Sequence, residues 1–208
     1  MSPADAMTAP KRVGLFGGAF DPPHRTHVAL AEAAIAQLQL DVLHIVPTGH
    51  AWHKQRPLTA AEHRLAMCSL AFAHVNRAQV DARETLRSGP SYTIDTLQEL
   101  QSEYPGAQLY LVMGEDQAKA LASWHRAEDL GLAAIICVAS RSEPHAADSS
   151  ADDSPKLQGV PLQRLQLPPS PLNATEVRDR TARGQSVSAL VLESVARYID
   201  QHHLYQAD

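Results

Sequence analysis

The fold is decided by the stretch Gly17-Gly18-Ala19-Phe20-Asp21-Pro22-Pro23-His24-Arg25-Thr26-His27. It follows a short apolar run over residues 13–16 and precedes a long segment rich in alanine and leucine, an order that predicts a strand, a glycine turn and the start of a helix. Two glycines let the backbone come close to a bulky anion, and the free amides and dipole of a helix N-terminus favour negative charge there. His24 and His27 are three residues apart, so on a helical turn they share a face. The stretch therefore indicates a phosphate-binding site.

Other well-known phosphate and metal patterns are absent from the sequence. It contains neither the dinucleotide fingerprint GxGxxG nor the P-loop GxxxxGK[ST]. Neither Cys68 nor Cys137 is close enough to the two histidines to complete a familiar zinc pattern. Both cysteines fall in apolar patterns, which predicts buried, reduced thiols. No set of protein metal ligands is predicted.

Composition predicts a single cytoplasmic domain. The chain has 208 residues, 44% of them hydrophobic, which is enough for one well-formed core. We expect residues 1–10 to be a disordered tail, residues 11–208 to form one domain, and residues 142–159 to be a mobile loop within it. The net charge of −5, without a basic cluster, argues against a nucleic-acid partner. The absence of a signal-peptide pattern or a long apolar run argues against a membrane, and a homo-oligomer is left open.

Strand and helix patterns alternate along the chain. Strands are expected over residues 11–16, 42–46, 79–82, 108–113, 132–139 and 160–167. Helices are expected over residues 28–38, after a Thr59–Glu62 capping box, over 92–103, after an Asn173–Glu176 cap, and over 187–199. The alternation predicts an α/β fold, a Rossmann-like parallel sheet with helices on both faces. Ligands bind such sheets beyond the carboxyl ends of the strands, which gathers the loops 17–27, 47–56, 114–125 and 168–178 at one edge.

Two groups of cations belong to those loops. His53, Lys54 and Arg56 form one, and Arg178 is the other. Taken singly, each can be a solvated surface charge, but with the histidine turn they could surround a triphosphate. An attacking phosphate monoester, with a second pKa of about 6, is already ionised at neutral pH, so the reaction needs positioning and charge stabilisation and no general base. Mg²⁺ is expected as a cofactor, held mainly by the phosphates of the ligand and by water.

The glycine–histidine stretch resembles the GxFDPxHxGH signature of the Rossmann-like nucleotidyltransferase superfamily. The matching residues are Gly18, Phe20, Asp21, Pro22, His24 and His27, whereas Thr26 stands where the family usually has glycine.

Three further motifs narrow the resemblance to the bacterial nicotinate-nucleotide adenylyltransferase family, over residues 11–205. Residues 47–54 resemble the Pro-x5-His-Lys loop, with Trp52 in place of proline. Residues 87–97 resemble RxGxSYTxDTL closely, and Gly114-x-Asp116 followed by Trp124 resembles GxDxxxxxxxW. In the final motif, ISSTxIR, Asn173-Ala174 replaces the two serines.

The resemblance implies a fold of the adenylyltransferase type and transfer of the adenylyl group of ATP to nicotinate mononucleotide, giving deamido-NAD and pyrophosphate in NAD biosynthesis. It implies that ATP is bound by Gly17, Gly18, Phe20, His24, His27, Asp116, Thr175 and Arg178, and that nicotinate mononucleotide is bound by His53, Lys54, Tyr92, Thr93 and Trp124. His24, His27, Lys54 and Arg178 would be the catalytic residues. Asp116 would contact a ribose, Trp124 would stack on the pyridine ring, and the region of Tyr92 and Thr93 would supply backbone donors to the nicotinate carboxylate.

Two other functions stay open. One is an adenylyltransferase that uses nicotinamide mononucleotide or another phosphate acceptor. The other is a nucleotide-binding sensor without turnover, which the departures at Thr26, Trp52 and Ala174 leave possible. Plainer roles are open as well: Trp124 could anchor the core, and Tyr92 could be a packing residue of a helix capped by Ser91.

Overall fold

The computed structural model describes residues 9–49, 57–140, 156–157, 160–168 and 172–206. Its centre is a six-stranded sheet in the order β3-β2-β1-β4-β5-β8, with every pair parallel. The strands are β1 (Arg12–Gly18), β2 (Val42–Pro47), β3 (Ala78–Val80), β4 (Gln108–Gly114), β5 (Ile135–Ser140) and β8 (Gln163–Gln166). A separate antiparallel pair joins β6 (Lys156–Leu157) and β7 (Val160–Pro161). The predicted α/β class with a parallel sheet is confirmed.

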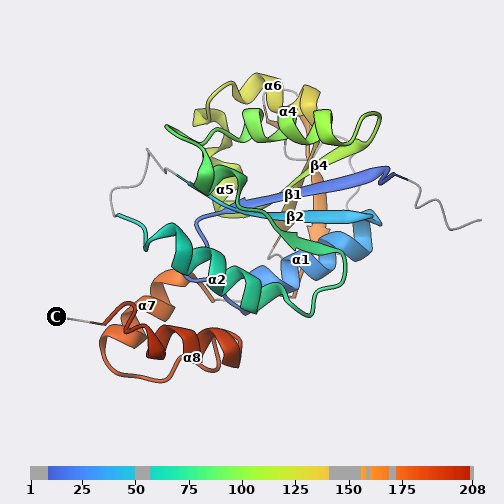
Figure 1. Ribbon diagram of the computed structural model, residues 1–208. Helices are drawn as coiled ribbons and strands as arrows, with labels where there is room; N and C mark the ends of the chain where they lie inside the picture. The colour runs from blue at the N-terminus through green and yellow to red at the C-terminus, as the bar shows by residue number, and fades with distance from the viewer. Residues whose placement is uncertain (1–8, 50–56, 141–155, 158–159, 169–171, 207–208) are drawn as a thin grey trace, which may run out of the picture.

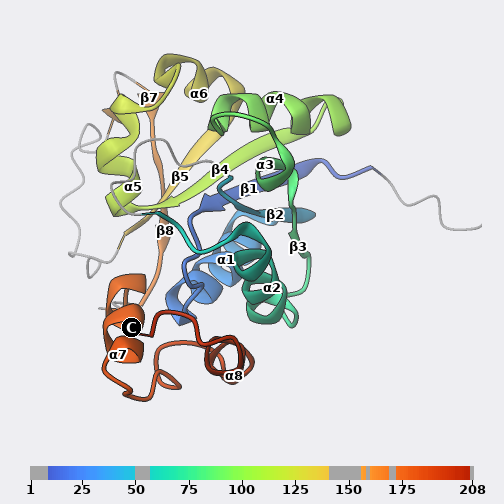
Figure 2. The same cartoon turned by 60° about the vertical axis from the view of Figure 1, so that its left-hand side comes forward.

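Helices cover both faces of the sheet, as predicted (Figures 1 and 2). In chain order they are α1 (Arg25–Leu38), α2 (Ala61–Phe72), α3 (Arg83–Leu86), α4 (Thr93–Glu103), α5 (Glu115–Ala120), the 3-10 turn η1 (Leu121–Ser123), α6 (Ala127–Ala133), α7 (Ala174–Ala182) and α8 (Glu193–Gln201). The helices α4 and α6 lie over one face, and α1 and α2 lie under the other (Figure 1). None of the helices in the described part of the chain is long and apolar enough to span a bilayer.

The central strands are apolar on both sides because both sides are covered. In β1, Val13 and Leu15 belong to the buried cluster under α4 and α6, whereas Phe16 belongs to the cluster with α1 and α2. Alternate side chains of a strand point to opposite faces, so one continuous apolar run serves both cores. Gly14 is needed between them, since a Cβ there would lie 2.6 Å from the side chains of Leu40 and Leu43.

The order of the strands reverses between β1 and β4. Sheets of this kind bind ligands at such a switch point, outside the carboxyl ends of the strands. Gly18 ends β1 and Gly114 ends β4, so the glycine–histidine stretch and the motif that begins at Gly114 emerge side by side. The fold thus brings together two motifs that are almost 100 residues apart in the sequence.

Several predicted boundaries are wrong. The last helix, expected over 187–199, begins only at Glu193, and the strand expected over 132–139 begins at Ile135 because α6 precedes it. Thr59 does not cap α2: Ala60 is the N-cap, and the Thr59 amide donates to the carboxylate of Asp21 over 3.3 Å. The strand expected over 160–167 is divided between β7 and β8.

Some predictions fall partly or wholly outside the described residues. They are the disordered tail over 1–10, the loop over 142–159, and the group formed by His53, Lys54 and Arg56 with Trp52 beside it. The cysteines do lie within the described part. Cys68 and Cys137 are buried and form no disulfide, and burial raises the pKa of the Cys137 thiol to about 12, so the predicted buried thiols are confirmed.

Candidate active site

The site is built on the end of β1. The strand continues through Gly17 and Gly18, where a glycine turn was expected, and the Gly18 carbonyl accepts a hydrogen bond from the Thr48 amide over 2.8 Å. A Cβ at Gly18 would lie 3.2 Å from the Phe20 ring, so glycine leaves room for that ring. Phe20 adopts a positive φ of 45°, which turns the chain toward α1. The N-terminus of α1 therefore faces the space beyond the sheet.

His24 and His27 are fixed against each other at the start of α1. His24 is the N-cap and His27 lies three residues on, with the two rings stacked at 3.7 Å between centroids. The His24 amide donates to Nδ1 of His27 over 3.1 Å. Since Nδ1 is the acceptor, a neutral His27 ring carries its proton on Nε2, which is then a hydrogen-bond donor. The ring also packs edge-on against Phe20 at 5.0 Å, so the orientation of this donor is set before any ligand arrives.

A cavity of about 580 Å³, which we term the histidine pocket, opens beside these rings. It is lined by Phe16, Gly17, Gly18, Ala19, Phe20, Asp21, His24, Thr26, His27, Leu30, Gly114, Asp116, Gln117, Ala139, Leu167, Pro168, Asn173, Ala174, Thr175 and Arg178. These residues come from the ends of β1, β4, β5 and β8 and from α1, α5 and α7. All eight residues predicted to contact ATP line this one cavity, so the structure brings them together.

Helix α7 supplies a guanidinium to the histidine pocket. Its predicted cap is confirmed, because Asn173 Oδ1 accepts a hydrogen bond from the Glu176 amide over 2.9 Å. Arg178 Nη1 donates to the carbonyl of Asp21 over 2.8 Å, and Nη2 donates to the hydroxyl of Thr175 over 3.0 Å. Both acceptors are uncharged, and together they hold the guanidinium against the wall of the pocket.

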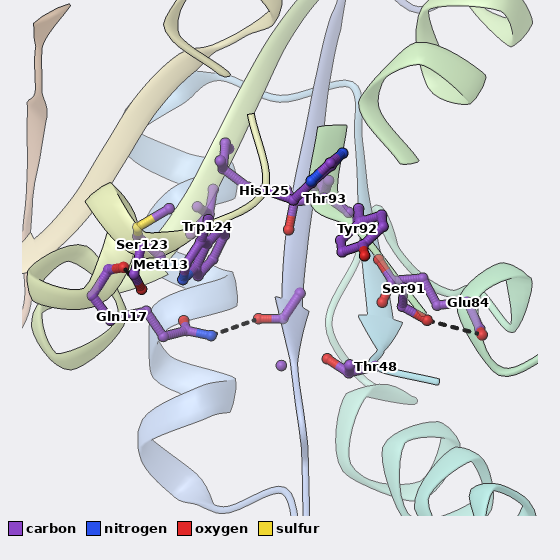
Figure 3. Close-up of a pocket in the computed structure, with 16 residues that line it drawn as sticks. Thr48, Glu84, Ser91, Tyr92, Thr93, Met113, Gln117, Ser123, Trp124 and His125 are labelled. Carbon is purple, nitrogen blue, oxygen red and sulfur yellow. Dashed lines mark hydrogen bonds between the residues drawn. The ribbon is translucent and has the colours of Figure 1, made fainter. Parts of the chain in front are cut away.

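A smaller cavity of about 150 Å³, the tryptophan pocket, adjoins the first (Figure 3). Its lining consists of Leu15, Gly17, Gly18, Thr48, Glu84, Ser91, Tyr92, Thr93, Leu111, Val112, Met113, Gln117, Ala120, Ser123, Trp124 and His125. Gly17, Gly18 and Gln117 line both cavities, and the Gln117 amide donates to the Gly17 carbonyl over 3.4 Å. The two pockets therefore meet at the end of β1.

Aromatic rings form the walls of the tryptophan pocket. Figure 3 shows Trp124 on one side and Tyr92 on the other, with the end of β1 between them. Trp124 also packs against the buried cluster under α4 and α6, so it is both a core anchor and part of the lining. Tyr92 stacks on His125 at 4.1 Å and is itself the N-cap of α4, so the alternative in which Ser91 caps this helix is wrong. Thr93 is the first residue of α4, where backbone amides lack helical partners.

Of the residues predicted to bind nicotinate mononucleotide, Tyr92, Thr93 and Trp124 are brought together in this pocket. His53 and Lys54 lie outside the described residues. Asp116 is exposed on the wall of the histidine pocket. The contacts of these side chains with a ligand stay predictions.

Sequence reasoning missed several lining residues. His125 and Gln117 stand beside Trp124 and Asp116 in predicted loops, and their position alone could have suggested them. Glu84 gave no signal, because the short helix α3 was not predicted. Its side chain is buried, accepts a hydrogen bond from the Thr96 hydroxyl over 2.8 Å, and has its pKa raised by burial.

Comparison with known proteins gives one family. The family model described as cytidylyltransferase-like matches residues 15–180. A protein of Albidiferax ferrireducens, named a probable nicotinate-nucleotide adenylyltransferase, is 52% identical over 196 residues, covering 94% of this chain and 98% of its own. A protein of the same name from Methylibium petroleiphilum is 40% identical, covering 94% and 92%.

The fold also matches a solved structure. The nicotinic acid mononucleotide adenylyltransferase of Plasmodium falciparum, complexed with NaAD, superposes with a TM-score of 0.74 at 17% identity. The match covers 94% of this chain and 97% of that one. At this identity the likeness establishes the arrangement of strands and helices, which is the same in both.

Proposed function

Because the chain belongs to the nicotinate-nucleotide adenylyltransferases of the cytidylyltransferase-like family, we propose that it transfers the adenylyl group of ATP to nicotinate mononucleotide. The products are pyrophosphate and deamido-NAD, and the reaction belongs to NAD biosynthesis. One observation carries this proposal: a large pocket beside a helix N-terminus and a small aromatic pocket meet at Gly17 and Gly18. Two ligands seated in them would bring their phosphates together at that point.

In this proposal the histidine pocket holds ATP. The α-phosphorus is attacked by a phosphate oxygen of the mononucleotide, and the bond from that phosphorus to the oxygen that bridges to the β-phosphate breaks. The electron pair leaves with pyrophosphate, so negative charge builds on the leaving group. His27 Nε2, the amides at the start of α1 and the Arg178 guanidinium offer donors and positive charge for it. No residue has to remove a proton, because the attacking phosphate is ionised at neutral pH.

The tryptophan pocket holds the pyridine ring. A cavity of about 150 Å³ suits a single ring better than a whole nucleotide. The flat face of Trp124 suits stacking, and the first amides of α4, next to Thr93, suit a carboxylate. A carboxylate there satisfies donors that an uncharged amide would satisfy less well, so the acid should be the preferred acceptor.

We also propose that Mg²⁺ enters with ATP. In the described part of the chain, no three or more His, Cys, Asp or Glu side chains are grouped so that they could hold a metal ion. Mg²⁺ keeps several waters and is commonly held by substrate phosphates with one or two carboxylates, and the exposed Asp116 is a carboxylate within this pocket. When bound, the ion would neutralise part of the phosphate charge, alongside the histidines and Arg178.

The proposed reaction is tested by measuring pyrophosphate release from ATP with each mononucleotide in turn. We expect kcat/KM for nicotinate mononucleotide to exceed that for nicotinamide mononucleotide by about 10²-fold or more. A higher kcat/KM for nicotinamide mononucleotide would instead show that the amide is the preferred acceptor. ATP binding without pyrophosphate release in the presence of any of the acceptors would instead indicate a nucleotide sensor.

Replacing Trp124 by alanine should raise KM for nicotinate mononucleotide by about tenfold or more, because the pyridine ring loses its stacking partner. KM for ATP should change little, since Trp124 does not line the histidine pocket. Steady-state kinetics with each substrate varied in turn measures both. Trp124→Phe keeps an aromatic face, so its KM for nicotinate mononucleotide should lie between those of wild type and Trp124→Ala. An equal rise in KM for ATP and for nicotinate mononucleotide would argue that Trp124 is only a core anchor.

A further inference from the structure

The loop between β1 and α1 forms a wall of the histidine pocket. Residues that do not line this pocket contact the loop on its other side. Ala19, Phe20 and Asp21 line the pocket, and His24 follows them. Asp21 is only 2% exposed, and its carboxylate is turned into the protein, where it accepts hydrogen bonds on both oxygens. None of the residues from 19 to 24 lines the tryptophan pocket. The position of this loop should therefore affect the ligand of one pocket and not of the other.

Helix α2 holds the loop from one side. The amide of Thr59 donates to Oδ2 of Asp21 over 3.3 Å. Arg64, 2% exposed, donates to the carbonyls of Thr59 over 2.8 Å and Ala19 over 3.1 Å. Burial lowers the pKa of the Arg64 guanidinium, and the negative charge of Asp21 opposes this shift by favouring the protonated form. These contacts hold the loop at the Ala19 carbonyl and at Oδ2 of Asp21.

Another partner of Asp21 comes from the C-terminal end of the chain. The Tyr205 hydroxyl donates to Oδ1 of Asp21 over 2.7 Å, the length of a charge-assisted hydrogen bond. Burial and the charge of Asp21 raise the pKa of Tyr205, so the hydroxyl keeps its proton and remains a donor. After α8 the chain turns back toward α7 (Figures 1 and 2), with positive φ values of 51° at His203 and 62° at Tyr205. Residues with a Cβ rarely adopt this conformation; here the His203 amide donates to the Asp200 carbonyl over 3.1 Å and the Leu204 amide donates to the Ile199 carbonyl over 3.0 Å, which supports the turn after α8.

We infer that Tyr205 is a positioning residue for ATP: by holding Asp21 it fixes the loop that forms one wall of the histidine pocket. The same loop carries the Asp21 carbonyl to which Arg178 is bonded, so a shift of the loop also moves the guanidinium. The C-terminal segment, about 180 residues away in sequence, thus becomes part of the support of the nucleotide site. This inference rests on the proposed function, since it takes ATP to be the ligand of the histidine pocket.

The test compares two tyrosines of the C-terminal region, each replaced by phenylalanine in the full chain. Tyr205→Phe removes the hydroxyl bonded to Asp21, whereas Tyr198→Phe removes the hydroxyl bonded to His63 over 3.0 Å, away from both pockets. We expect Tyr205→Phe to raise the dissociation constant for ATP by about tenfold, because a charge-assisted hydrogen bond is lost. Its dissociation constant for nicotinate mononucleotide, and both constants of Tyr198→Phe, should stay within about twofold of wild type. Isothermal titration calorimetry measures all of them without turnover.

Wild-type affinity for ATP in a folded Tyr205→Phe variant would overturn the inference, and so would an equal loss for both ligands. A second measurement needs no variant: ATP should slow amide hydrogen exchange at residues 202–205, because coupling between two sites is reciprocal. Exchange that is unchanged by ATP would equally overturn it. Failure of the proposed function is a separate result, since a chain that releases no pyrophosphate can still bind ATP and show both effects.

Discussion

Replacing His27 by alanine is expected to lower kcat by about 10²–10³-fold, the cost of removing one donor that faces developing charge. Nδ1 of the ring accepts the His24 amide, which leaves Nε2 as the donor and fixes where it points. The substitution removes this donor and also leaves the His24 amide without its acceptor. Pyrophosphate release at saturating ATP and nicotinate mononucleotide measures the effect.

Two conservative variants separate the contributions of the two ring nitrogens. His27→Gln can place an amide donor near the position of Nε2, whereas His27→Asn can replace only the acceptor at Nδ1. If charge stabilisation dominates, the glutamine variant should keep more activity than the asparagine variant. His74→Ala is a control for loss of a histidine, because that side chain lies in the turn just after α2 and is 54% exposed. Turnover like that of wild type in His27→Ala would remove His27 from the mechanism.

Replacing Arg178 by alanine is expected to lower kcat/KM for ATP by about 10²-fold, since a guanidinium aimed at phosphates makes charge-assisted hydrogen bonds. The loss has a second source, because the Asp21 carbonyl loses the donor that holds it at 2.8 Å. Arg178→Lys keeps the charge but cannot contact the Asp21 carbonyl, the Thr175 hydroxyl and a phosphate in the same fixed geometry. We therefore expect the lysine variant to recover only part of the loss, as measured with ATP varied at saturating nicotinate mononucleotide.

Arg180 provides a matched control on the same helix. Its guanidinium pairs with Glu176 over 2.6 Å, a partly exposed i,i+4 contact on the surface of α7. Such pairs contribute roughly 0.3–0.5 kcal/mol, so Arg180→Ala should leave both activity and folding almost unchanged. Equal losses in the alanine variants of Arg178 and Arg180 would mean that α7 needs positive charge in general and that Arg178 has no special position.

The sheet and its ligand edge could be predicted from sequence because they depend on local patterns. Val13 to Phe16 is apolar, glycines follow, and the alanine-rich segment after His27 has helical spacing, so strand, turn and helix were assigned together. The rule for parallel sheets then placed the loops that begin at Gly17 and Gly114 at the same edge, without any long-range signal in the sequence. All eight residues that the family resemblance assigned to ATP line one cavity at that edge.

The errors arose where distant partners override local preference. Residues 187–191 have helical spacing but form a turn, in which the Leu190 carbonyl accepts the Arg25 amide over 3.0 Å. Thr59 is a good capping residue, yet its amide is taken by Asp21. In the sequence, Leu132 extends the apolar run that forms β5, but in the structure it lies near the end of α6 and is 88% exposed. In each case the deciding contact or exposure is a tertiary property.

The supporting residues of the site were missed for a related reason. Gln117 and Tyr205 are common residue types that hydrogen-bond to residues 100 or more positions away in the sequence, whereas Glu84 is bonded by Thr96 of the next helix. A motif search cannot detect such contacts, because the spacing between the partners follows no local period. Motifs located the residues expected to contact the ligands, while the fold was needed to find Glu84 and Gln117 in the lining and Tyr205 behind it.

The central claim is that the rim of the sheet forms a cradle for a triphosphate. A crystal structure with a non-hydrolysable ATP analogue and nicotinate mononucleotide tests this most directly. We predict phosphate oxygens within hydrogen-bond distance of His27 Nε2 and Arg178, the pyridine ring against Trp124, and the two α-phosphates meeting beside Gly17 and Gly18. An analogue bound with its triphosphate away from His24, His27 and Arg178 would contradict the account.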